Sequence, residues 1–151
     1  RRAGVYGGDG VGNRADELAS VTLRAARAID AIMNNLVQQI KKALPKYRLT
    51  FGSELDLQDQ LAELFSLEGI AFKREMKLSE RDRPDFMTQP GAIAIEVKVA
   101  GSIESHLRQL KRYNDNDLVN GTILIGTKPF RVPETLSGKP VAAINVGGNR
   151  L

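Results

Sequence analysis

The sequence predicts an α/β fold in which helices pack on a meander of strands. Two short apolar runs bounded by turn signals, at residues 93–99 and 122–127, are typical of buried strands, and segments with apolar residues at helical spacing precede and separate them. The chain has 151 residues, 42% of them hydrophobic, so it can bury one sizeable core. We therefore expect a helix, three strands, a helix and a strand in that order, after a long N-terminal helix.

The first 46 residues are expected to form a flexible glycine-rich start and a long amphipathic helix. Residues 4–12 have the composition of a mobile lead-in and fit neither phosphate-binding loop signature. Asn13 can cap the helix and Pro45 ends it. From residue 14 to about residue 43, apolar side chains recur at helical spacing at Leu18, Val21, Ala25, Ile29, Ile32, Leu36 and Ile40. This stripe predicts either packing on the chain's own domain or contact with a partner, in a homodimer or a larger complex.

The other elements are expected between residues 47 and 146. Ser53 followed by Asp56 resembles a capping box and opens a helix to about residue 68, where Gly69 stops it. The polar run at 77–83 is expected to be a loop. Strands are expected at residues 47–51, 70–76, 85–88, 93–99, 122–127 and 141–146, the last of them at an edge of the sheet, and a second helix at 102–114.

Composition limits the functions that this chain can have. It contains no cysteine and a single histidine, which excludes disulfides and argues against a zinc site. No run approaches the roughly 18 apolar residues of a membrane span, and the start lacks the apolar segment of a signal peptide, so we expect a cytoplasmic protein without membrane contact. The net charge is +4, but residues 51–100 hold six Lys or Arg against ten Asp or Glu. An acidic middle between basic ends is compatible with a cation held beside a phosphate, and chance also produces it.

Two charged side chains, Glu96 and Lys98, interrupt the apolar run at 93–99. The turn signal at 89–92 predicts a hairpin that places Asp85 directly opposite Glu96, and alternation puts Lys98 on the same face of the strand. Two carboxylates whose β-carbons lie about 5 Å apart repel each other by roughly 3 kcal/mol at an effective dielectric near 20. A divalent cation between the two acids would replace this repulsion by attraction.

The same three side chains are the minimal set for hydrolysis of a phosphodiester bond. Two carboxylates, completed by carbonyls, waters and phosphate oxygens, form the environment that Mg²⁺ prefers, and Mn²⁺ can take its place. The metal would activate water and offset charge on the phosphate, while Lys98 would orient the water or stabilise the transition state. The spacing therefore predicts a metal-dependent site at Asp85 and Glu96.

Pro84-Asp85, a short spacer and Glu96-Val97-Lys98 in an apolar strand resemble the motif of the PD-(D/E)XK nuclease superfamily. The expected order of elements over residues 48–127 is also similar to its core. The resemblance implies a restriction-endonuclease-like nuclease domain at residues 47–151. It implies an Mg²⁺-dependent deoxyribonuclease, an endonuclease that leaves a 5′-phosphate and a 3′-hydroxyl, with Asp85 and Glu96 as metal ligands and Lys98 as catalytic base or stabiliser.

Further residues match features of related nucleases. Glu54 opens the helix before the hairpin, where relatives often place an extra acidic metal ligand, and Glu63 is a weaker candidate. Favourable interaction of a first-turn acid with the helix dipole also explains Glu54. Gln109 and Tyr113 resemble the Gln-x-x-x-Tyr element of RecB-like members, although ordinary helix-surface polarity accounts for them equally. His106 is interpreted as a surface or core residue and not as a general base.

Basic residues near this helix are candidate contacts to nucleic-acid phosphates. Arg108, Lys111 and Arg112 lie on the helix, and Arg83 precedes the hairpin. Simple solvation also explains them. Two other functions stay open: a catalytically silent nucleic-acid-binding or assembly subunit with a nuclease fold, and the nuclease module of a larger machine, since the sequence opens on Arg1.

Overall fold

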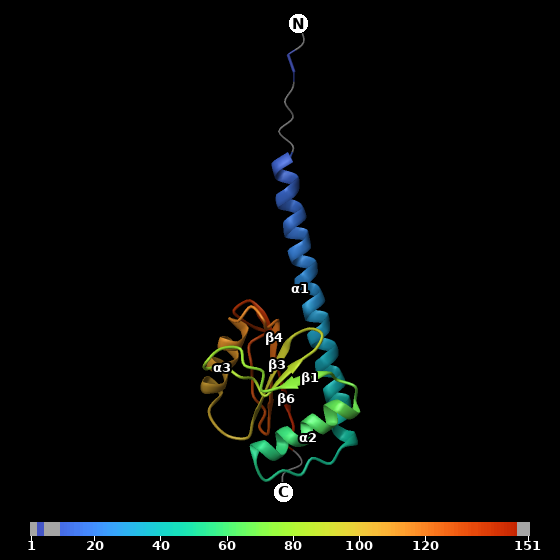
Figure 1. The fold of residues 1–151 in the computed structure, drawn as a ribbon, viewed down its shortest axis with the longest axis vertical. Coiled ribbons are helices and arrows are strands. Elements are labelled where there is room, and N and C mark those ends of the chain that lie inside the picture. The colour runs from blue at the N-terminus through green and yellow to red at the C-terminus, as the bar shows by residue number, and fades with distance from the viewer. Residues whose placement is uncertain (1–2, 5–9, 148–151) are drawn as a thin grey trace.

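The fold is mixed α/β, with a long N-terminal helix and a six-stranded mixed sheet (Figure 1). The computed structural model describes residues 3–4 and 10–147. Within them, no helix is long and apolar enough to cross a membrane. The elements are α1 (Gly10–Ala43), a 3-10 turn η1 (Leu44–Lys46), α2 (Glu54–Leu67), β1 (Phe72–Arg74), β2 (Phe86–Thr88), β3 (Ile93–Lys98), α3 (Ile103–Asn114), β4 (Gly121–Gly126), β5 (Thr135–Leu136) and β6 (Lys139–Asn145).

The sheet has the strand order β1-β2-β3-β4-β6-β5. The first three strands form an antiparallel meander, whereas β3, β4 and β6 are parallel to one another and β5 is antiparallel to β6. Parallel neighbours need a crossover, and α3 supplies the one between β3 and β4. The predicted order of helix, three strands, helix and strand is therefore confirmed for residues 54–126.

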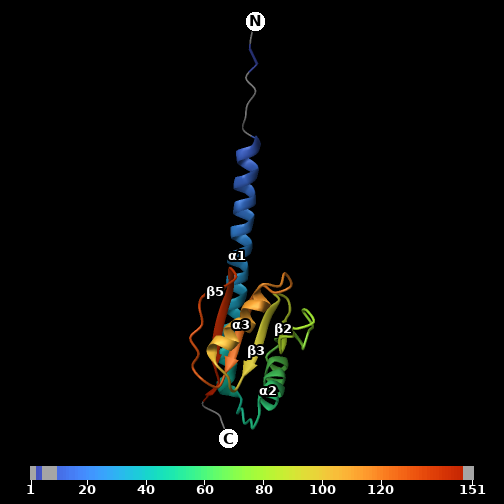
Figure 2. The ribbon, with the colours of Figure 1, turned by 90° about the vertical axis from the view of Figure 1, so that its left-hand side faces the viewer.

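Helices cover both faces of the sheet (Figure 2). Strand alternation divides the core in two. Ile93, Ile95 and Val97 of β3 face the larger cluster, which contains buried residues of α1 and α2. Ala94 faces the smaller cluster, which contains Leu110 and Tyr113 of α3. The predicted separation of the two faces of β3 is confirmed, and Glu96 lies on the α3 side.

Only the C-terminal part of α1 packs on the sheet. Met33 and Ile40 are buried there, while residues 12–28 are exposed and the helix projects beyond the domain (Figures 1 and 2). Leu18 and Val21 of the predicted stripe are 69% and 54% exposed. Packing on the chain's own domain is thus confirmed for one half of the helix, and a partner at the other half stays a prediction.

The start of α1 differs from the sequence-based expectation. The helix begins at Gly10, so Asn13 lies inside it and does not cap it. Of the expected mobile lead-in, residues 10–12 are helical and residues 5–9 lie outside the described part of the chain. Glycine lowers helix stability by about 1 kcal/mol relative to alanine but does not forbid a helix, which explains the error.

The expected strand at residues 47–51 was wrong, since this segment forms no strand of the sheet. Leu49 and Phe51 nevertheless bury their side chains, and this burial produced the alternating pattern. The strand at 141–146 is present as β6, but it lies between β4 and β5 and not at the edge. The two-residue β5 was missed because so short a strand carries no periodicity.

The cap of α2 is confirmed with one difference. The Ser53 hydroxyl accepts a hydrogen bond from the Asp56 amide at 3.1 Å, as a capping residue does. The Asp56 carboxylate, however, accepts from the amide of Gly52 at 3.2 Å. Gly69 follows the helix with φ of 73°, a left-handed conformation in which glycine is favoured.

Candidate active site

The β2–β3 hairpin closes in the predicted register. Phe86 pairs with Ile95, so the next step along the ladder sets Asp85 beside Glu96. Thr88 fixes this register, because its hydroxyl accepts from the Ile93 amide at 3.1 Å and donates to the Ile93 carbonyl at 3.3 Å. The site therefore begins with two acids at the end of a short hairpin.

Asp85 and Glu96 are held in an environment that disfavours their charges. Asp85 Oδ2 accepts from the Val97 amide at 2.7 Å, and Glu96 is 4% exposed. Burial and the charge of Glu96 raise the pKa of Asp85 to about 7, and burial also raises the pKa of Glu96. Lys98 opposes both shifts. The two acids thus carry the unfavourable interaction that a bound cation would relieve.

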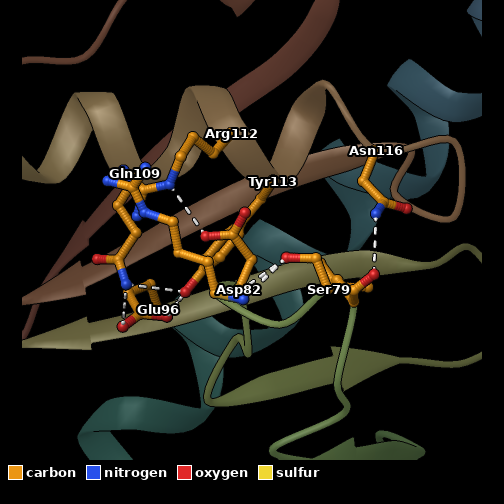
Figure 3. A network of polar contacts seen from close by, with 9 residues as sticks. Ser79, Asp82, Glu96, Gln109, Arg112, Tyr113 and Asn116 are labelled. Carbon is orange, nitrogen blue, oxygen red and sulfur yellow. Dashed lines mark hydrogen bonds and ion pairs between the residues drawn. The ribbon is translucent and has the colours of Figure 1, made fainter.

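Hydrogen bonds from α3 fix the orientation of Glu96 (Figure 3). The Tyr113 hydroxyl donates to Glu96 Oε2 at 2.9 Å, and Gln109 Nε2 lies 3.3 Å from Glu96 Oε1 and 2.9 Å from the Tyr113 oxygen. Burial and the charge of Glu96 raise the pKa of Tyr113, so the phenol keeps its proton and remains a donor. The four-residue spacing of Gln109 and Tyr113 therefore serves to position this carboxylate.

Lys98 completes the polar cluster. Its Nζ lies 3.1 Å from Glu96 Oε1, with 20% of the lysine side chain exposed against 5% of the glutamate side chain. Because residues 96 and 98 share a face of β3, the strand itself delivers the ammonium to the carboxylate. The predicted set of two acids and a lysine is assembled in one place.

Glu54 reaches the same end of β3 from the first turn of α2. Its Oε2 accepts from the Val99 amide at 3.3 Å, and its charge contributes to the raised pKa of Asp85. Glu63 is exposed on α2 and its charge acts on Tyr47, outside this cluster. Of the two acids considered on this helix, the structure brings only Glu54 to the site.

The predicted phosphate contacts differ in their surroundings. The Arg112 Nε lies 3.0 Å from Asp82 Oδ1, an ion pair that fastens the 77–83 loop to α3 (Figure 3). Lys111 pairs with Asp115 at 3.0 Å on the exposed side of the helix. Arg83 and Arg108 are exposed, and no ion pair of either appears within the described residues. Arg83 and Arg108 are therefore better placed than Arg112 to contact a phosphate.

The buried surroundings of His106 were not predicted from the sequence. This residue is 4% exposed, and its ring lies edge-on against Phe130 with centroids 5.4 Å apart. A β-carbon on Gly101 would lie 2.8 Å from its Cε1. Burial and the charge of Lys98 lower the pKa of His106. Because Phe130 lies far from His106 in the sequence, no local pattern could have predicted this contact.

The donor set fits a hard divalent cation in part. Asp85 and Glu96 are adjacent oxygen donors, and Glu54 is nearby, which is the chemistry that Mg²⁺ selects. Across residues 3–4 and 10–147, no three acidic or histidine side chains form a group that could hold a metal ion by themselves. The remaining ligands would have to be water, backbone carbonyls and substrate, as Mg²⁺ commonly has.

The chain was compared with protein-family models, with curated proteins and with solved structures, and none of them matches it. The resemblance to PD-(D/E)XK nucleases therefore depends on Asp85, Glu96 and Lys98 and on the elements around them. A fold does not by itself assign a function, which has to be argued from the chemistry of the site.

Proposed function

We propose that this chain is a metal-dependent nuclease with a restriction-endonuclease-like core that hydrolyses phosphodiester bonds in DNA, as an endonuclease. The observation that carries the proposal is the arrangement of Asp85 beside Glu96, with the Lys98 ammonium 3.1 Å from Glu96. Buried acids with raised pKa values are costly for a fold and are concentrated at functional sites. A module that only binds a polyanion has little use for them.

In this proposal each side chain has a distinct role. Asp85 and Glu96 hold Mg²⁺ or Mn²⁺, and Glu54 is a secondary ligand. A bound divalent cation supplies a Lewis acid that offsets negative charge on the phosphate. Lys98 places a positive charge where the attacked phosphate gains negative charge, and it orients the attacking water.

Two further side chains act on the metal ligands indirectly. Tyr113 and Gln109 keep Glu96 in one orientation, through hydrogen bonds of 2.9 and 3.3 Å. Such partners of a metal ligand typically contribute about 10- to 100-fold to affinity or activity. They are positioning residues, because they contact the ligand and not the substrate.

Cleavage assays test the proposal. Purified protein is incubated with supercoiled circular, linear and branched DNA and with RNA, in Mg²⁺ or in EDTA. We expect Mg²⁺-dependent cutting of at least one DNA form and nicking of the closed circle, both abolished in Glu96→Gln and Lys98→Met. Glu134→Gln and Lys42→Met, at exposed positions outside the site, are the matched controls and should cut normally.

Other outcomes separate the alternatives. Undiminished cutting by Glu96→Gln and Lys98→Met would remove the proposed site. Attack on DNA ends alone would indicate an exonuclease. Retention of DNA by the wild type and both variants, with no product in any metal, would instead favour a nucleic-acid-binding subunit.

A further inference from the structure

Both carboxylate oxygens of Glu96 already contact other side chains of the protein. Tyr113 occupies Oε2, while Gln109 and Lys98 share Oε1. A carboxylate so engaged can accept a metal ion most easily if one of its partners withdraws. The identity of that partner follows from how firmly each one is held.

Tyr113 and Gln109 are fixed more firmly than Lys98. Tyr113 is 1% exposed and packs in the smaller core cluster, and Gln109 is hydrogen-bonded to its hydroxyl at 2.9 Å. Lys98 is held to Glu96 by one contact, its side chain is 20% exposed, and it ends a flexible four-carbon stem. Lys98 can therefore leave Glu96 without breaking the core, whereas Tyr113 cannot.

Charge also makes Lys98 the competitor of a metal ion. Its ammonium and a divalent cation are both attracted to the same buried carboxylate, and they cannot both occupy one side of Oε1 at close range. Gln109 and Tyr113 are neutral donors and carry no such repulsion toward a cation. Of the three partners, the lysine is the one that a metal would displace.

We propose that Lys98 occupies Glu96 in the metal-free protein and is displaced from it when a divalent cation binds. The inference rests on the proposed function, since it takes Glu96 to be a metal ligand. Displacement would free the ammonium from the carboxylate. Lys98 is then available to a phosphate only when the metal is present. Metal binding therefore supplies the Lewis acid and also releases the lysine from Glu96.

The affinity of the protein for Mn²⁺ alone tests this inference without any measurement of cleavage. Free Mn²⁺ is followed by electron paramagnetic resonance at fixed pH and ionic strength, with wild type, Lys98→Met and Lys98→Arg. We expect Lys98→Met to bind Mn²⁺ about tenfold more tightly than the wild type or better, since the competing charge is gone. Lys98→Arg should bind about threefold more weakly or worse, because a guanidinium grips a carboxylate through two hydrogen bonds.

The arginine variant separates direct competition from a general field effect. It keeps the charge of Lys98, so a lysine that acts only by making the local electrostatic potential more positive would give equal affinities for Lys98→Arg and the wild type. That equality, or a Lys98→Met variant that binds no more tightly, would overturn the inference and leave the proposed function intact. Absence of Mn²⁺ binding to the wild type and to Lys98→Met would instead contradict the metal site itself.

Folding of each variant is checked by far-UV circular dichroism and urea unfolding. Should Lys98→Met not fold, Lys98→Gln replaces it as the neutral variant, with the same expected gain in Mn²⁺ affinity. Lys42→Met, which removes one exposed positive charge from the end of α1, is the control for net charge and should bind Mn²⁺ as the wild type does.

Discussion

Replacing Asp85 by asparagine is expected to stabilise the metal-free protein and to abolish metal binding. In the folded chain the pKa of Asp85 is raised from 3.8 to about 7, first by burial and then by the charge of Glu96. Ionised Asp85 therefore opposes folding. Asparagine removes this charge, and its side-chain oxygen can still accept the hydrogen bond that the Val97 amide donates to Asp85.

The sign and size of the effect follow from the pKa difference. A carboxyl whose pKa is higher in the folded state stabilises the fold while it is protonated, and this contribution declines as the pH rises from 3.8 to about 7. A difference of about 3 units corresponds to about 4 kcal/mol above pH 7. Domains of this size unfold with about 5–15 kcal/mol, so the change is readily measured.

Urea unfolding followed by circular dichroism, in EDTA at pH 4 to 8, measures the prediction. Asp85→Asn should differ little from the wild type near pH 4 and exceed its unfolding free energy by up to about 4 kcal/mol at pH 8. Mg²⁺ should then stabilise the wild type at pH 8 and leave the variant unchanged. Asp117→Asn, at an exposed position, is the control. A variant no more stable than the wild type at pH 8 would refute the idea that Asp85 is a strained acid.

Three further substitutions test separate parts of the structure. Tyr113→Phe removes the donor to Glu96 Oε2, and we expect kcat for DNA cleavage to fall about 10- to 100-fold with little change in KM; an unchanged kcat would deny this positioning role. Gly101→Ala forces a β-carbon to within 2.8 Å of His106 at a φ of 100°, and urea unfolding should show a loss of about 1–3 kcal/mol. Thr88→Val removes two buried hydrogen bonds of the hairpin and should cost about 1–3 kcal/mol in the same assay.

Local sequence patterns predicted the parts of the fold that local physics dictates. Ser53 marks the start of α2 and Gly69 its end, because a side-chain cap and a left-handed glycine act over a few residues. The register that sets Asp85 beside Glu96 was predictable because a short hairpin leaves few ways to pair its strands. Patterns failed where tertiary packing decided the structure. The apolar residues at 47–51 suggested a strand, but Leu49 is buried without belonging to the sheet. No local pattern marks the two-residue β5.

The sequence alone determined that Glu96 and Lys98 share one face of β3 and that the hairpin sets Asp85 opposite Glu96, because alternation and turn geometry need no other part of the chain. Only the tertiary structure decided how these groups are held. The contacts of Glu96 with Tyr113, of Glu54 with the Val99 amide, and of Asp82 with Arg112 join segments far apart in the chain. Burial, which sets the charge state of the acids, likewise depends on the packing of whole helices on the sheet, and no short stretch of sequence encodes it.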